Sequence, residues 1–254
     1  MRKYLTKQVT DQVNEGLQLI TKTKYLWILT VCYTMALVSA NWFDPRLLNI
    51  FFITTGAGAL LFPFTYLFSD IITEVYGFKN ARLAVWTGLL FNIVFLIIAQ
   101  IITLLPAPSH YDPSAFNGFL QFNMRIVLAS ITTYIFTEAL NSYCVAKLKI
   151  WFAGKYLGLR FLISTMLAHA ANIILFGYGA FYGTMTNSEL LHLLWTSWLL
   201  MVSLELILLP ASIKITRTLK HREHVDIYDT QTNFNIFSLN ASYAHTANEY
   251  EKSQ

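Results

Sequence analysis

Apolar residues along the chain gather in six long runs separated by polar connections. A helix needs about 20 predominantly apolar residues to cross the hydrocarbon core of a bilayer. The runs approach or exceed this length, so they predict an all-α polytopic membrane protein with six transmembrane helices. The predicted spans are residues 25–43, 47–68, 81–105, 124–146, 157–182 and 190–213.

The connections and the two ends complete the predicted organisation. The longest connection is residues 106–123, where Pro106, Pro108 and Pro113 act as helix breakers. Beyond residue 213 the sequence turns polar, and part of this tail is expected to be mobile. We therefore expect a cytoplasmic N-terminal segment (1–24), a six-helix transmembrane domain (25–213) and a polar cytoplasmic C-terminal tail (214–254).

Lysine and arginine are distributed unevenly between the two sides of the predicted membrane domain. Sixteen of the 18 lie in the two ends of the chain or in the connections on the same side, whereas only Arg46 and Arg125 lie on the other side. Cytoplasmic loops carry the excess of positive residues in membrane proteins. Both termini are therefore predicted to face the cytoplasm, as an even number of spans requires.

Composition supports the membrane interpretation and narrows the class of protein. Hydrophobic residues make up 55% of the chain and charged residues 13%, and the mean hydropathy is +0.47. Soluble domains average about 25% charged residues. The net charge of +4 could suggest nucleic acid, but the positive residues lie where membrane topology requires them. We expect the lipid bilayer, and not nucleic acid, to be a partner.

Sequence signatures of enzymes and of cofactor sites are missing. The chain has no GxxxxGK[ST] phosphate loop, no HExxH and no GxSxG motif. Cys32 and Cys144 lie within predicted helices and provide neither a metal-binding spacing nor a disulfide framework. We expect no enzymatic activity, no cofactor and no metal.

Polar residues inside the predicted spans are the candidates for function, because they are costly in a bilayer and usually have a role. Glu138 shares a helix face with Tyr134 and Asn141, four residues before it and three after it. A ring that stacks, a carboxylate and an amide could together recognise a flat polar ligand. The alternative is a protonated glutamate bonded to a neighbouring helix.

Five further residues, in three groups, are candidates in the other helices. His169 and Asn172 share a face of the fifth predicted span, where a histidine would otherwise form an ordinary interhelical bond. Glu205 lies within the sixth span and could line a cavity or contact a helix. Asp70 and Glu74, one turn apart after the second span, could bind a cation, accept amine protons or pair with the nearby basic residues Lys79 and Arg82.

Three segments resemble the queuosine precursor transporter family, also called the YhhQ or VUT family. The most specific is LFPFTYLFSDIITEVYG at 61–77, followed by Ala81 and Arg82. The others are LRFLIST at 159–165, continuing to AFYG at 180–183, and DIYD at 226–229 with TNFN at 232–235. The segments occur in family order and cover roughly residues 55 to 237.

The resemblance implies a multi-pass importer of the cell inner membrane that carries queuosine precursors. The expected substrates are the 7-deazapurines 7-cyano-7-deazaguanine and 7-aminomethyl-7-deazaguanine. Compared with the family pattern, Asn172 stands where aspartate is usual, Glu138 where glutamine is common and Met201 near an expected lysine. A shifted substrate preference would follow if these positions touch the substrate.

Other functions stay open at this point. The chain could be the substrate-binding membrane subunit of an ATP-driven vitamin-type importer, or a transporter of another purine-like base. A membrane enzyme acting on a lipid or isoprenoid would need a cluster of acids at one face, for which Asp70 and Glu74 are the one candidate pair. A non-transporting assembly factor and a homo-oligomeric state are neither favoured nor excluded.

Overall fold

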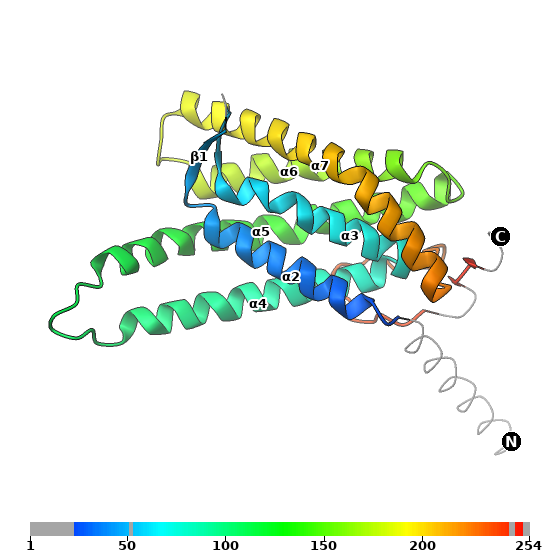
Figure 1. Cartoon of the computed structure of the whole chain (residues 1–254), viewed down its shortest axis with the longest axis horizontal. Coiled ribbons are helices and arrows are strands. Elements are labelled where there is room, and N and C mark those ends of the chain that lie inside the picture. The colour runs from blue at the N-terminus through cyan, green and yellow to red at the C-terminus, as the bar shows by residue number, and fades with distance from the viewer. Residues whose placement is uncertain (1–22, 51–52, 244–246, 251–254) are drawn as a thin grey trace, which may run out of the picture.

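The computed structural model describes residues 23–50, 53–243 and 247–250 and consists mainly of long helices packed side by side (Figure 1). Within this part of the chain, six spans are long and apolar enough to cross a membrane, which confirms the predicted all-α polytopic class. The elements are α2 (Leu26–Phe43), β1 (Leu47–Ile50), β2 (Ile53–Gly56), η1 (Ala57–Leu60), α3 (Phe62–Tyr76), α4 (Phe78–Leu104), α5 (Ser114–Trp151), α6 (Leu157–Phe181) and α7 (Asn187–Glu223).

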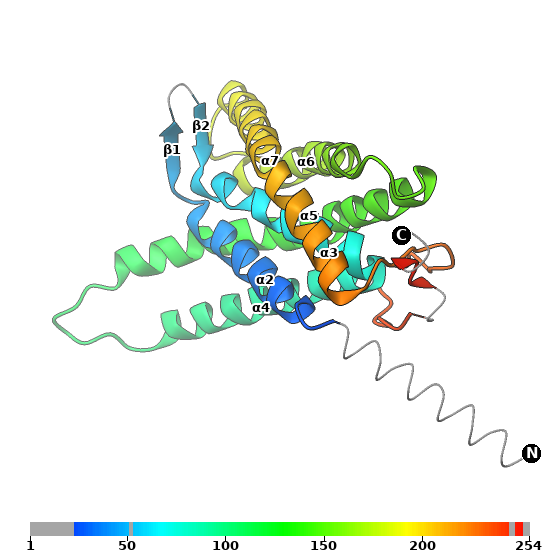
Figure 2. The same cartoon turned by 45° about the vertical axis from the view of Figure 1, so that its right-hand side comes forward.

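The helices run back and forth between two ends of the molecule. The terminal end holds the start of α2, the end of α7 and the C-terminal segment, and the hairpin end holds β1 and β2 (Figures 1 and 2). Which end faces the cytoplasm stays a prediction. The predicted N-terminal segment 1–24 lies outside the described residues, except for its last two.

Helix α3 lies at the centre of the bundle, where it packs against α2, α4, α5 and α7. In the span that contains it, 78% of the residues are buried, against 28–44% in the other spans. Its sequence nevertheless carries Thr65, Ser69, Asp70, Thr73 and Glu74, all of them buried. The central helix therefore brings the most polar face of the membrane domain into its interior.

The predicted second span differs from the structure at both ends. Leu47–Ile50 and Ile53–Gly56 pair as the two antiparallel strands of a β-hairpin in place of the expected helix, with Leu47 opposite Gly56. Helix α3 starts only at Phe62, where Pro63 occupies the first turn, a position that tolerates the missing N–H. The helix then continues past the expected end at residue 68 to Tyr76, and Gly77, with φ +83°, ends it.

Helices α5 and α7 are longer than the spans predicted from the sequence. Helix α5 begins at Ser114, inside the connection predicted for 106–123, and α7 continues past residue 213 to Glu223. At about 1.5 Å per residue, the 38 residues of α5 extend about 57 Å, more than a hydrocarbon core of about 30 Å. Helix α7, with 37 residues, is almost as long, so both helices exceed the thickness of the hydrocarbon core.

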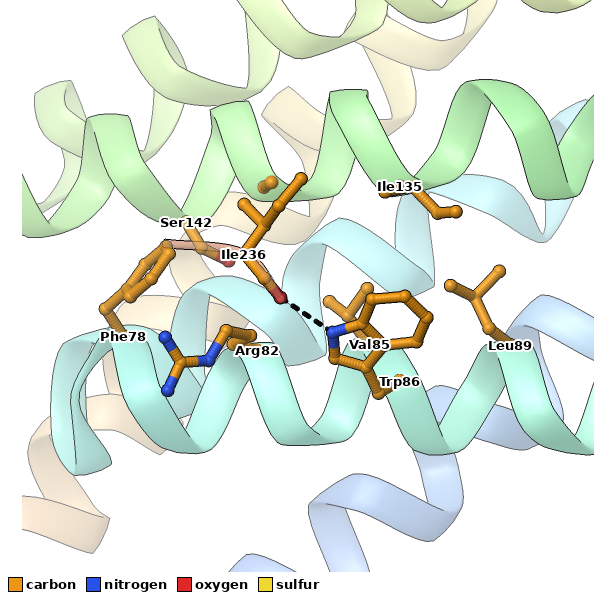
Figure 3. Close-up of a pocket in the computed structure, with 9 residues that line it drawn as sticks. Phe78, Arg82, Val85, Trp86, Leu89, Ile135, Ser142 and Ile236 are labelled. Carbon is orange, nitrogen blue, oxygen red and sulfur yellow. Dashed lines mark hydrogen bonds between the residues drawn. The ribbon is translucent and has the colours of Figure 1, made fainter. Parts of the chain in front are cut away.

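The C-terminal segment, the described residues after α7 (224–243 and 247–250), packs onto the terminal end. Val225, Ile227 and Tyr243 are buried there. Figure 3 shows one contact, in which Trp86 Nε1 of α4 donates to the carbonyl of Ile236 at 2.8 Å. Arg82, one turn earlier, donates to two further carbonyls of the segment, at Asn235 and Asn240.

Candidate functional site

The interior of the bundle contains two polar layers, of which the first lies at the terminal end. Its centre is Glu74 of α3, which is fully buried. Arg160 of α6 binds it with both guanidinium nitrogens, Nη1–Oε2 at 2.5 Å and Nη2–Oε1 at 2.9 Å. Lys220 Nζ of α7 lies 2.6 Å from Oε1. The carboxylate of Glu74 is thus occupied by protein cations.

Asp226 of the C-terminal segment joins the same layer. Its Oδ1 accepts from Lys149 Nζ at 2.5 Å and from Lys220 Nζ at 2.8 Å. Lys149 Nζ also donates to the carbonyls of Glu74 and Ile227, at 2.7 and 2.6 Å. Three cations and two carboxylates therefore connect α3, α5, α6, α7 and the segment after α7. We call these five residues, Glu74, Lys149, Arg160, Lys220 and Asp226, the ionic cluster.

The second polar layer begins one helical turn further into the bundle, at Asp70. The carboxylate is fully buried, accepts from Asn141 Nδ2 at 2.6 Å, and accepts from Thr165 Oγ1 at 3.3 Å. Beside it, the hydroxyls of Ser69 and Ser142 lie 3.2 Å apart. Asp70 is thus positioned by α5 and α6 through neutral donors.

Glu138 and His169 occupy the next turn towards the hairpin end. Glu138 Oε1 accepts from Thr65 Oγ1 at 3.3 Å, whereas Oε2 has no protein partner. The His169 ring packs edge-on against Tyr66, with centroids 4.5 Å apart, and neither ring nitrogen has a partner. The hydroxyls of Tyr66 and Tyr134 are also buried without one.

Glu205 of α7 adds a third acid to this layer. It is 1% exposed, its Oε2 has no partner, and its charge acts on both Asp70 and Glu138. Among the described residues, no lysine, arginine or histidine forms an ion pair with any of these three acids. The second layer is therefore rich in acceptors and lacks a protein counter-charge.

Unpartnered polar atoms are concentrated in this second layer. Buried polar groups almost always have a hydrogen-bond partner, so a local concentration of exceptions indicates water or a ligand. The protein atoms without partners here are Tyr66 Oη, Tyr134 Oη, Thr137 Oγ1, Glu138 Oε2, Asn141 Oδ1, His169 Nδ1 and Nε2, and Glu205 Oε2. We call this set of residues, together with Asp70, the central polar site.

Most of the residues singled out from the sequence lie in or next to this site. Asp70 and Asn141 are in direct contact, and Tyr134, Glu138 and His169 lie in the central polar site. Asn172, one turn beyond His169, lines a small cavity at the hairpin end. Glu74 also lies outside the central polar site, because it belongs to the ionic cluster.

The suggested pairing of the α3 acids with Lys79 and Arg82 is wrong. Lys79 Nζ donates to the carbonyl of Ser242 at 2.6 Å, and Arg82 binds carbonyls of the C-terminal segment. The partners of Glu74 come instead from α6 and α7, 86 and 146 residues further along the chain. Sequence distance hid these contacts.

Sequence reasoning missed Tyr66 and Asp44. Tyr66 stands four residues before Asp70, so helical spacing alone could have placed it on the same face. Asp44 ends α2, where an acid normally meets solvent, yet it is 7% exposed. Its position inside the fold depends on the β-hairpin that the hydropathy pattern concealed.

Comparison with known proteins identifies a family of membrane transporters. A family model described as "Putative vitamin uptake transporter" matches residues 56–215, which is more than half of the chain. The chain belongs to the vitamin uptake transporter family. It is accordingly a multi-pass membrane transporter and not an enzyme.

One relative in this family comes from Bacillus subtilis (strain 168) and is named "Probable queuosine precursor transporter". It is 26% identical over 190 residues, which cover 73% of this chain and 80% of the relative. The resemblance inferred from the three sequence segments is thereby confirmed. No solved structure matches the chain.

Proposed function

We propose that this transporter imports a 7-deazaguanine precursor of queuosine across the inner membrane and binds it in the central polar site. The observation that carries the proposal is the concentration of buried, unpartnered polar atoms around three acids without a counter-charge. The name of the bacterial relative supports the choice of substrate.

The chemistry of the site fits a guanine-like edge. Such a base offers N1–H and a 2-amino group as donors, which one carboxylate can accept together. Glu138 has a free oxygen for this purpose, and the rings of Tyr66 and His169 offer aromatic surface. The base O6 needs a donor, which a tyrosine hydroxyl or a histidine N–H can supply.

Import requires the helices to separate, because the cavities that adjoin the site are small. Two cavities towards the hairpin end measure about 20 and 30 Å³, room for roughly one water molecule each. At the terminal end, the ionic cluster closes the bundle. We infer alternating exposure of the central polar site, with the ionic cluster as the gate on the side of the termini.

Uptake into liposomes that contain only the purified chain tests the proposal. Radiolabelled 7-cyano-7-deazaguanine should accumulate, and excess 7-aminomethyl-7-deazaguanine should compete more strongly than adenine or guanine. Liposomes without protein provide the background. Uptake of labelled 7-cyano-7-deazaguanine at the background rate would contradict the proposal.

The same experiment distinguishes a second candidate, the substrate-binding subunit of an ATP-driven importer. The description of the family as vitamin uptake transporters favours this alternative. Such a subunit would bind the base but would not move it without an ATPase. Uptake by the chain alone excludes the alternative, whereas binding without uptake supports it.

A further inference from the structure

Asp44 at the hairpin end is a buried acid outside the central polar site. It directly follows α2, and its backbone N–H donates to the carbonyl of Ala40 at 3.1 Å. The side chain is 7% exposed, and its Oδ2 has no protein partner. An ionised carboxylate in such a place is costly unless a cation accompanies it.

The backbone after the β-hairpin is shaped around this carboxyl group. Gly58 N–H donates to it. A Cβ at Gly56 would lie 2.3 Å from Asp44 Oδ1, and one at Gly58 would lie 2.5 Å from the same atom. Only glycine lets the chain approach so closely. The fold thus holds one oxygen firmly and leaves the other free.

Asp44 belongs to the wall of two adjoining cavities. Both are lined by Asp44, Ala59, Phe176 and Met201, and their volumes are about 20 and 30 Å³. One extends to Asn172, a single turn from His169 of the central polar site. A chain of one or two water molecules could therefore join Asp44 to the central polar site.

Asp44 is the one titratable residue among those that line these cavities, which come from α2, the β2–η1 segment, α3, α5, α6 and α7. Burial raises the pKa of Asp44 from 3.8 to about 7, although the Gly58 N–H partly opposes this. A group with such a pKa can gain and lose a proton near neutral pH.

The surroundings fit a proton better than a metal cation. Metal cations such as Mg²⁺ and Ca²⁺ prefer six or more oxygen ligands. Of the residues lining the two cavities, only Asp44 contributes a fully buried atom without a partner. The hydroxyls of Thr55 and Ser197 already pair with each other at 2.9 Å.

We propose that Asp44 takes up the proton that drives uptake from the side of the membrane opposite the termini and releases it towards the side of the termini. The inference rests on the proposed import function. Protonation would neutralise the carboxyl group as the hairpin end closes, and release would follow once the ionic cluster has opened the other side.

Two transport assays on Asp44→Asn separate coupling from binding. For one proton per substrate, an inward gradient of about one pH unit should support about tenfold accumulation by the unmodified chain. The variant should lose this accumulation but keep the exchange of labelled for unlabelled base in vesicles without a gradient. Asp112→Asn, which changes an exposed acid in the same way, should behave like the unmodified chain in both assays.

Several outcomes would overturn the proposal. These are gradient-driven accumulation by Asp44→Asn at the unmodified level, accumulation that follows a sodium gradient in place of the proton gradient, and loss of exchange in a variant that still elutes as a folded protein. Asp44→Ser, which still offers an oxygen to Gly58 N–H, replaces Asp44→Asn if the latter does not fold.

A measurement without substrate keeps this test independent of the identity of the transported base. Infrared difference spectra recorded on either side of about pH 7 should show a carboxyl band in the unmodified chain and in Asp112→Asn. Asp44→Asn or Asp44→Ser should show a weaker band, because only the contribution of Asp44 is removed and the buried acids Asp70, Glu138 and Glu205 remain. An unchanged band in these variants contradicts the proposal, whereas a weaker band together with failed uptake rejects only the 7-deazaguanine assignment.

Discussion

Single residues in this protein differ sharply in how their buried charge is stabilised. Glu74 is surrounded by Arg160, Lys149 and Lys220, whereas Asp70, one turn away on the same helix, is held by an amide and a hydroxyl. A buried charge whose partner is removed typically costs 3–5 kcal/mol. Identical side-chain chemistry therefore serves structure in one layer and is available for binding in the next.

Removal of one partner from the ionic cluster should destabilise the protein. Arg160→Ala leaves Glu74 without its two-nitrogen partner, and we expect a loss of about 3 kcal/mol in the free energy of unfolding. Arg217→Ala, an exposed arginine on α7, should change it by less than about 0.5 kcal/mol. Thermal unfolding in detergent measures both, and equal midpoints for the two variants would contradict the role of the cluster.

Glu138 in the central polar site and Asn172, one turn beyond His169, should set the preference among bases. Glu138→Gln combined with Asn172→Asp introduces the side chains that the family resemblance leads us to expect at these positions, so the order in which competing bases inhibit uptake should change. An effect of about tenfold between two bases corresponds to about 1.4 kcal/mol, the worth of one hydrogen bond to a charged group. Asp112→Asn is the control, and an unchanged order of competitors would refute the assignment.

The central polar site could be predicted from sequence only in part. Glu138, Asn141 and Tyr134 share one helix, so their common face follows from spacing alone. The contact between Asn141 and Asp70 joins residues 71 positions apart, and no pattern within either helix encodes it. In the sequence, Lys149 and Arg160 contributed only to the count of positive residues that predicts the orientation. Their contacts with Glu74 could not be predicted, because these also join distant helices.

At the scale of elements, the β-hairpin and the junction at Gly77 explain why hydropathy misplaced both ends of the second predicted span. Residues 47–56 are as apolar as a helix, but Ile50, Ile53, Thr54 and Thr55 favour strands, and a short apolar run cannot be assigned by hydropathy alone. Pro63 marked the true start of α3. The other spans are long and apolar, and for these the pattern placed each helix correctly, with errors only at the ends.

Gly77, between α3 and α4, should be intolerant of a side chain. Its φ of +83° disfavours other residues, and a Cβ would lie 2.4 Å from Tyr243 Oη and 2.7 Å from Ile227 Cγ2. Gly77→Ala should therefore loosen the C-terminal segment and increase its cleavage by protease about tenfold, as for a local loss of about 1.4 kcal/mol.

Gly118→Ala is the matched control, because a Cβ there meets no atom within 4 Å. In the exposed first turns of α5, alanine should leave protease sensitivity unchanged and slightly favour the helix. If both alanine variants were cleaved at the rate of the unmodified chain, the tight packing of the segment against Gly77 would be refuted.

At the scale of the whole molecule, the polar layers form a column from the hairpin end to the terminal end. Asp44 lies at one end, the central polar site in the middle and the ionic cluster at the other, while large apolar side chains of α4 such as Phe91, Ile98 and Ile101 stay exposed. That outer surface suits lipid, since exposed apolar area of this extent is unusual in a soluble monomer.

Orientation in the membrane can be tested with single cysteines. In a background that carries Cys32→Ser and Cys144→Ser, a membrane-impermeant maleimide should label Ser109→Cys in intact cells. It should label Thr230→Cys only after permeabilisation, because the distribution of positive residues predicts cytoplasmic termini. Both positions are exposed, so burial does not limit the reaction. The reverse pattern would show the opposite orientation.

The ionic cluster also imposes an order on biosynthesis. Glu74 leaves the ribosome 75 residues before Lys149, 86 before Arg160 and 146 before Lys220, and Asp226 follows last. The central helix therefore enters the membrane with an acid whose counter-charges have not yet been made. Assembly of the bundle can finish only when the end of the chain arrives, so a product shortened before residue 149 would present Glu74 to the cell's quality control without any of its three cations.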